Sequence, residues 1–169
     1  MKISFKITAK LLAQIHHDLS HPHPFAAERI GFVQCQVAAL HGKRLLILAH
    51  EFHPIEDADY LNDPAVGAMM GPAAIRKALQ IAYAAPMCMF HVHRHDHRGD
   101  PWFSHIDLTE NQKFVPDFWH VQPKFPHGAI VLSFDSMAGL AWIPSKRTPI
   151  RISEFSIVGS PMRFLGVRQ

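Results

Sequence analysis

The sequence predicts an α/β domain of the layered α+β kind, with a central mixed β-sheet flanked by helices. Apolar residues make up 48% of the 169 residues and charged residues only 18%, against an average of about 25% charged residues in globular domains. This length and composition are typical of one folded domain. Short apolar strands alternate with helical segments, and no repeat or linker interrupts them, so we expect a single domain over residues 1–169.

The first half of the chain combines one amphipathic helix with a hairpin. Leu11, Leu12, Ile15 and Leu19 recur at helical spacing, and Pro22 cannot continue a helix. A short turn at 41–43 separates two apolar runs, which is typical of a hairpin. The expected elements are a strand over 3–8, a helix over 9–19, hairpin strands over 31–40 and 44–52, and a long surface loop over 53–71.

The second half alternates helices and strands. Pro72 suits the first position of a helix, and Ser104 or Asp107 could cap the next one. An apolar run, Met87–Phe90, leads directly into histidines and predicts a buried strand. The expected elements are helices over 72–85 and from 104 to 115, and strands over 87–93, 129–134, 138–143 and 151–158.

Charge, cysteine content and hydropathy exclude several classes of protein. The net charge is only +3, with no run of basic residues, so we expect no nucleic-acid partner. Cys35 and Cys88 are too few for a disulfide framework, which is typical of a reducing compartment. Lysines interrupt the N-terminal apolar residues, and no eighteen apolar residues run together, so we expect neither a signal peptide nor a membrane span. The sequence therefore predicts a soluble, cytoplasmic protein.

Histidine is the compositional anomaly, with fourteen residues, four of them within the seven residues 91–97. His91 and His93 are two apart, so on a strand their imidazoles project from the same face. Asp107, at the start of the following helix, is a candidate third ligand. Two imidazoles and one carboxylate, with a fourth position left open, form the ligand set of a catalytic zinc site. We therefore predict that His91, His93 and Asp107 bind Zn²⁺.

The ordered set Glu28-x-x-Gly31, His91-x-His93 and Ser104-x-x-Asp107 resembles the JAMM motif of the MPN/JAB metalloproteases. The order of expected helices and strands is also similar over roughly residues 5–145. The resemblance implies an MPN/JAB fold related to the deaminases. It also implies that Glu28 is the general base and that Ser104 donates a hydrogen bond to the developing oxyanion.

Two features depart from the family pattern. Arg94 follows His93, where the family usually has proline, and ten residues separate His93 from Ser104, where the family commonly has seven. The pair His93 and His95 leaves eight residues before Ser104. We favour His91 and His93 because the apolar strand directly precedes them, and the shifted pair stays an alternative. His95 and His97 would then steady the substrate, support the ligands or simply face solvent.

The resemblance implies a zinc metallopeptidase or isopeptidase that cuts after the C-terminal glycine of a ubiquitin-like protein. That protein, or its conjugates, is the expected partner. The short chain looks like the stand-alone bacterial JAB proteins, some of which serve ubiquitin-like conjugation and antiphage systems. Two alternatives stay open: a non-catalytic scaffold of the same fold, and a zinc hydrolase or deaminase that acts on a small molecule.

Overall fold

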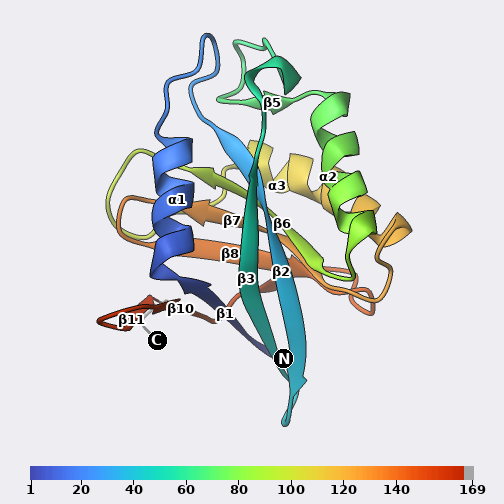
Figure 1. Cartoon of the computed structure of the whole chain (residues 1–169). Helices are drawn as coiled ribbons and strands as arrows, with labels where there is room; N and C mark the ends of the chain where they lie inside the picture. The colour runs from blue at the N-terminus through green and yellow to red at the C-terminus, as the bar shows by residue number, and fades with distance from the viewer. Residues whose placement is uncertain (166–169) are drawn as a thin grey trace.

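A computed structural model of the protein describes residues 1–165. One mixed sheet of nine strands, in the order β11-β10-β1-β3-β2-β6-β7-β8-β9, organises these residues (Figure 1). Its strands are β1 (Lys2–Thr8), β2 (Ile30–Leu40), β3 (Arg44–Pro54), β6 (Cys88–Arg94), β7 (His127–Leu132), β8 (Met137–Trp142), β9 (Ile150–Arg151), β10 (Glu154–Val158) and β11 (Arg163–Leu165).

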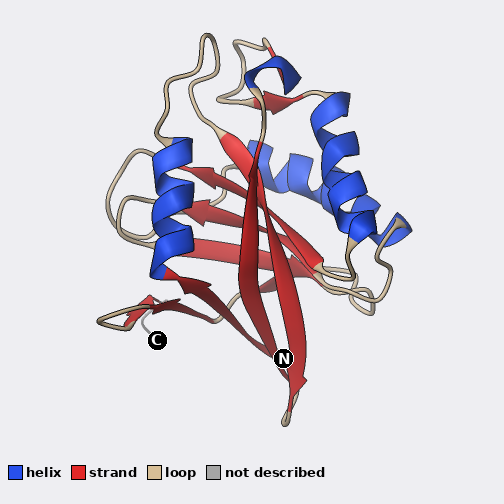
Figure 2. Ribbon diagram, in the orientation of Figure 1, coloured by secondary structure: helices blue, strands red, loops and turns tan. Residues whose placement is uncertain are grey.

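The sheet combines parallel and antiparallel pairs. Strand β1 runs parallel to both β3 and β10, and β6 runs parallel to β7, whereas the other neighbours are antiparallel. The long β2–β3 hairpin extends beyond the other strands at one end (Figure 2). This topology confirms the mixed α+β class, with helices on both faces of the sheet.

Helix α1 (Ala9–Leu19) covers one face, and helices α2 (Pro72–Ala84) and α3 (His105–Phe114) lie on the other (Figures 1 and 2). Thr8 caps α1, since its hydroxyl oxygen accepts a hydrogen bond from the Leu11 amide at 3.1 Å. The apolar side of α1 packs on inward-facing residues of β1, β6 and β10 to form one core. The small side chains Ala74, Ala78 and Ala82 bring α2 close to the opposite face, where a second core forms.

The structure confirms all three helices and the other predicted strands to within a few residues. The single strand expected over 151–158 is wrong, because the segment forms two strands, β9 and β10, which pair with β8 and β1 respectively. The segment 53–71 was wrongly predicted to be loop throughout. It contains a 3₁₀ turn (Asp57–Asp59) and two short strands, β4 (Tyr60–Leu61) and β5 (Met69–Met70), which pair with each other. Two-residue strands are too short to leave a periodic pattern. A second 3₁₀ helix (Val115–His120) and strand β11 were also not predicted.

His127 is a buried histidine at the start of β7, on the side of the sheet that faces α2 and α3. Its Nδ1 accepts a hydrogen bond from the Met89 amide at 3.1 Å, and its Nε2 lies 3.1 Å from the Gln122 carbonyl oxygen, to which it donates. The imidazole ring stacks on the Phe118 ring, with their centroids 5.3 Å apart. Burial lowers the pKa of His127 to about 4, because the imidazolium form would lose its hydration.

We expect His127 to make the protein acid-labile. The unfolded chain takes up a proton at this residue near pH 6.5, whereas the folded protein does so only near pH 4. The contribution of His127 is therefore fully present above pH 6.5 and is lost as the pH falls toward 4, by about 3 kcal/mol at most. The measurement is urea unfolding of the metal-free protein between pH 7.5 and 4.5. As the pH falls, the free energy of unfolding should decrease more steeply for the wild type than for His127→Gln. Parallel pH profiles for the two proteins would contradict the assignment.

Within residues 1–165, every helix is too short or too polar to cross a lipid bilayer.

Candidate metal centre

Strand β6 and the residue that follows it place three histidines on the same side of the sheet. The side chains of residues 89, 91 and 93 face α2 and α3, whereas those of Phe90 and Val92 belong to the core under α1. Beyond the end of β6, the His95 amide donates to the Leu132 carbonyl oxygen of β7 at 2.9 Å. This bond continues the pairing of β6 with β7 to His95. The imidazoles of His91, His93 and His95 therefore follow one another along one face.

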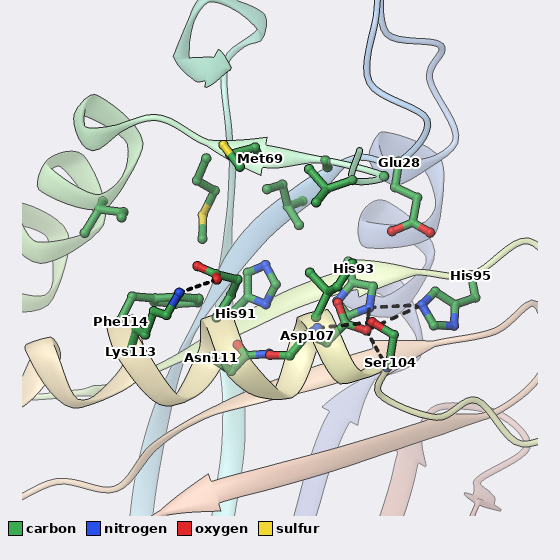
Figure 3. Close-up of a pocket in the computed structure, with 18 of the residues that line it drawn as sticks. Glu28, Met69, His91, His93, His95, Ser104, Asp107, Asn111, Lys113 and Phe114 are labelled. Atoms are coloured by element: carbon green, nitrogen blue, oxygen red, sulfur yellow. Dashed lines mark hydrogen bonds and ion pairs between the residues drawn. The ribbon is translucent and has the colours of Figure 1, made fainter. Parts of the chain in front are cut away.

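His93 and His95 meet Asp107 at the open end of this row (Figure 3). The Nε2 atoms of the two histidines are 3.2 Å apart. The Asp107 Oδ2 atom lies 3.6 Å from Nε2 of His93 and 4.0 Å from Nε2 of His95. His93 is almost fully buried, and the side chains of His95 and Asp107 are about one-fifth exposed (17% and 20%). The site is therefore a small nitrogen and oxygen cluster that is still open to the pocket.

A capping box at the start of α3 fixes the Asp107 carboxylate. The Ser104 amide donates to Asp107 Oδ2 at 2.7 Å, and Ser104 Oγ accepts from the Asp107 amide at 3.1 Å. An ionised carboxylate oxygen can accept more than one partner, so Oδ2 can still face His93. Burial opposes ionisation of Asp107, but His93 and the Ser104 hydrogen bonds outweigh it and hold the pKa of this carboxyl well below its usual range.

Glu28 approaches the cluster from the segment before β2. Ile30 pairs with His93 in the β2–β6 ladder, which brings Glu28, two residues earlier, level with His95. One carboxylate oxygen of Glu28 and one ring nitrogen each of His93 and His95 all lie within 4.8 Å of one another. Burial raises the pKa of Glu28, and the nearby Asp107 carboxylate acts in the same direction, against an opposing effect of His93. A raised pKa makes Glu28 a stronger base.

The segment before β5 holds Glu28 in place. The Gly67 carbonyl oxygen accepts hydrogen bonds from the amides of Ala27 and Glu28, at 2.7 and 3.1 Å. A Cβ atom on Gly67 would lie only 3.2 Å from Glu28 Cδ and 3.4 Å from its Oε2. The absence of a side chain at position 67 therefore leaves room for the Glu28 carboxylate. Sequence reasoning missed this contact, because residue 67 was assigned to an unstructured loop.

His91 lies farther along the row, away from Glu28, on the side toward Phe114 (Figure 3). Its ring packs against the rings of Phe32 and Phe114, with centroid distances of 5.9 and 5.3 Å. Burial lowers the pKa of His91 to about 3, with a further effect of His93 in the same direction. Asp107 and Glu28 come close to His93 and His95. This geometry favours the shifted pair, His93 and His95, over the pair His91 and His93 that the sequence led us to prefer. Asn111, which sequence reasoning missed, also lines this inner end and donates to the Asp107 carbonyl oxygen at 2.7 Å.

The remaining predicted site residues are divided between the pocket and its rim. Ser104 lines the pocket beside Asp107, and its hydroxyl proton stays available because Oγ acts only as an acceptor in the capping box. His97 is outside the metal cluster: its Nδ1 donates to the Arg98 carbonyl oxygen at 2.9 Å, and its ring stacks on Trp102. Of the two secondary candidates, only His95 therefore joins the other site residues.

The donor set of His93, His95 and Asp107 fits zinc. In a tetrahedral site with Zn–N and Zn–O bonds of 2.0–2.1 Å, neighbouring ligand atoms are about 3.3–3.4 Å apart. The observed separations of 3.2, 3.6 and 4.0 Å require only small side-chain adjustments. Two imidazoles with one carboxylate favour zinc over magnesium or calcium, which prefer oxygen ligands. The carboxylate of Glu28 lies within 4.8 Å of a ring nitrogen of both histidines, so it would border an ion held there.

The cluster forms one end of a pocket of about 480 Å³. From His93, His95 and Asp107 the pocket continues between α3 and the segment that ends in β5. Met69, Met70 and Ile75 form its apolar wall on one side, with Phe114 on α3 opposite. Asp117, which follows α3, also lines the pocket.

Neither protein-family models nor curated proteins give a match to this chain.

Proposed function

We propose that this protein is a zinc-dependent peptidase or isopeptidase of the JAMM type, with an MPN/JAB-like fold. Its substrate would be the bond after the C-terminal glycine of a ubiquitin-like protein. The observation that carries the proposal is the convergence of His93, His95, Asp107 and Glu28 at one end of a pocket. In the register that the geometry favours, eight residues separate the second histidine from Ser104. The JAMM motif commonly has seven residues there, whereas the pair His91 and His93 would leave ten.

His93, His95 and Asp107 would hold the zinc ion. Bound zinc supplies Lewis acidity, which polarises a substrate carbonyl and lowers the pKa of water toward 7. Neutral imidazoles suit this task, and burial lowers the pKa of the partly buried His95 ring as well. The capping box presents the Asp107 carboxylate in its ionised form at neutral pH.

Glu28 would move the proton in this reaction. It would accept a proton from the attacking water and return it to the amine that leaves, as a general base and then a general acid. Its partly buried position suits both steps, because a carboxyl with a raised pKa accepts a proton more readily. The hydrogen bonds to Gly67 keep the backbone of Glu28 fixed while the side chain acts.

Ser104 would stabilise the negative charge that develops on the substrate carbonyl oxygen. Its hydroxyl lies in the pocket beside Asp107, and the capping box leaves its proton free to donate. Donors already aimed at a developing oxyanion give large rate effects, because they need no reorganisation during the reaction.

The pocket suits an extended peptide tail. Within residues 1–165, β5 pairs with β4 alone, so one of its edges has no strand partner. Met69 and Met70 of β5 line the pocket, and a substrate tail could therefore add as a further strand along this edge. The apolar wall around Met69 and Phe114 would receive side chains of the tail.

The decisive test combines metal analysis with a cleavage assay. Ubiquitin joined through its C-terminal glycine to a reporter peptide is the first substrate, and we expect chelator-sensitive cleavage directly after that glycine. One zinc ion per chain without cleavage of the peptide bond would favour a zinc hydrolase that acts on a small molecule. A protein that binds no zinc under any condition would favour the non-catalytic scaffold.

Gly67→Ala should impair catalysis without removing a ligand. The added Cβ would press on the Glu28 carboxyl group at 3.2 Å, and small displacements of a catalytic group are costly. We expect a loss of about tenfold or more in kcat with zinc content unchanged. Ala65→Ser, at an exposed position of the same segment, is the control and should be neutral. Wild-type kcat in Gly67→Ala would show that Glu28 does not depend on this close contact.

A further inference from the structure

Trp102 is a large apolar side chain that stays 62% exposed. It lies in the segment between His95 and α3. Its indole stacks on the His97 ring, with centroids 5.1 Å apart and an interplanar angle of 28°. It also meets the His95 ring edge-on at 6.2 Å. An exposed tryptophan held against another ring is typical of a binding surface, because its free face can bury apolar atoms at little cost in entropy.

Hydrogen bonds fix the ring behind Trp102. The His97 amide donates to the His95 carbonyl oxygen at 2.9 Å, and the His97 carbonyl oxygen accepts from the Phe134 amide at 2.9 Å. Its Nδ1 donates to the Arg98 carbonyl oxygen. Pro101, which is buried, restricts the backbone immediately before the tryptophan. The indole is therefore presented by an ordered segment.

Trp102 contacts the row of histidines at its His95 and His97 end. One part of the His95 ring, Nε2, faces His93 and Asp107, while the ring also contacts the indole. The pocket extends from the cluster along α3 toward Phe114, and Trp102 does not line it. A substrate whose tail fills the pocket would therefore bring the group beyond its reactive bond toward Trp102.

We propose that Trp102, supported by His97, is the subsite for the leaving group, and that it binds the methylene stem of a lysine whose Nζ is the scissile nitrogen. This inference rests on the proposed function and specifies its substrate as an isopeptide. A lysine stem has four methylene groups between Nζ and Cα, which can lie flat on the indole. The leaving group of an ordinary peptide bond would instead bring a polar backbone close to this apolar surface, where it gains less.

Binding can be measured without turnover on the zinc-loaded full chain carrying Glu28→Gln. One probe is acetyl-Gly-Gly joined to Nζ of N-α-acetyl-lysine amide, and the other is acetyl-Gly-Gly joined to the α-nitrogen of alanine amide. The indole N–H resonance of Trp102 reports contact. It is separable from Trp142, which is buried, and from Trp119, whose indole donates to the Phe125 carbonyl oxygen.

We expect the lysine probe to shift the Trp102 resonance and to bind at least about fivefold more tightly than the alanine probe, the effect of burying one to two methylene groups. Trp102→Ala should abolish this preference, and Trp102→Phe should retain part of it. Tyr83→Ala is the matched control, because Tyr83 is an exposed aromatic residue on α2 that does not line the pocket.

Equal binding of the two probes, or a lysine preference that survives in Trp102→Ala, would overturn the subsite. Failure of the proposed function has a different signature. If the lysine probe is preferred and the preference depends on Trp102, but the wild type cleaves neither a ubiquitin fusion nor the lysine probe, the subsite is supported and the peptidase function is rejected. A chain that cleaves both kinds of bond, with kcat/KM unchanged in Trp102→Ala, would keep the peptidase and reject the subsite.

Discussion

His95→Ala and His93→Ala should each lose zinc, whereas His91→Ala should retain it. Removal of either imidazole of the 3.2 Å pair leaves one nitrogen and Asp107, too few ligands for a stable tetrahedral site. We expect zinc affinity to fall by at least about a hundredfold, more than the effect of losing an outer partner. Competition with a chromophoric chelator measures this directly. His91 is packed against Phe32 and Phe114, so its loss should lower thermal stability and leave one zinc per chain.

His97→Ala is the internal control for this series, since it lies two residues beyond His95 and outside the cluster. It should bind zinc like the wild type. The opposite pattern, in which His91→Ala empties the site and His95→Ala does not, would restore the register favoured from the sequence alone. It would also mean that the side chains rearrange when zinc binds.

Glu28→Gln should abolish hydrolysis while zinc stays bound. Glutamine keeps the size of the side chain and can still accept a hydrogen bond, but it cannot take up a proton at neutral pH. A positioned general base contributes typically about 10²–10⁴-fold to the rate, and we expect a loss of kcat in this range. The measurement is kcat and KM on the same substrate, together with zinc content. KM should change little, because the pocket walls at Met69 and Phe114 are untouched.

Zinc content separates the two roles that Glu28 could have. If Glu28→Gln loses zinc along with activity, Glu28 is a ligand. This is geometrically possible, because the Glu28 carboxylate lies within 4.8 Å of one ring nitrogen each of His93 and His95. A chain that keeps both zinc and activity would contradict a role for Glu28 in proton transfer. Glu28→Asp tests position alone, since the shortened side chain retains its charge but withdraws from His93 and His95.

Much of the fold could be predicted because the patterns are local. The spacing of Leu11, Leu12, Ile15 and Leu19 predicts α1, and all four side chains are buried as expected. The turn at 41–43 predicts the β2–β3 hairpin. By contrast, β4 and β5 have two residues each, and their pairing depends on contacts distant in sequence. The order of strands in the sheet is likewise a tertiary property, which no local pattern carries.

The candidate site shows the same division. The sequence indicated the chemical groups, and the structure brings Glu28, His93, His95, Ser104 and Asp107 together. The sequence alone could not decide which two histidines bind the metal, because His91, His93 and His95 recur at every second residue and so share one face of a strand. The choice depends on Phe32 and Phe114, which cover His91 from β2 and α3. The contact of Gly67 with Glu28 is similarly visible only in three dimensions.

Arg94 separates the two favoured ligands and projects to the opposite face of the sheet. Its guanidinium donates to the His16 carbonyl oxygen in the last turn of α1 at 3.2 Å and to Asp96 at 2.8 Å, and it lies 5.1 Å from the centre of the Phe134 ring. Helix α1 thus anchors the backbone from which both imidazoles extend. Selectivity for an ion depends on how rigidly its donors are spaced. Here that rigidity originates partly in a helix on the reverse side of the protein.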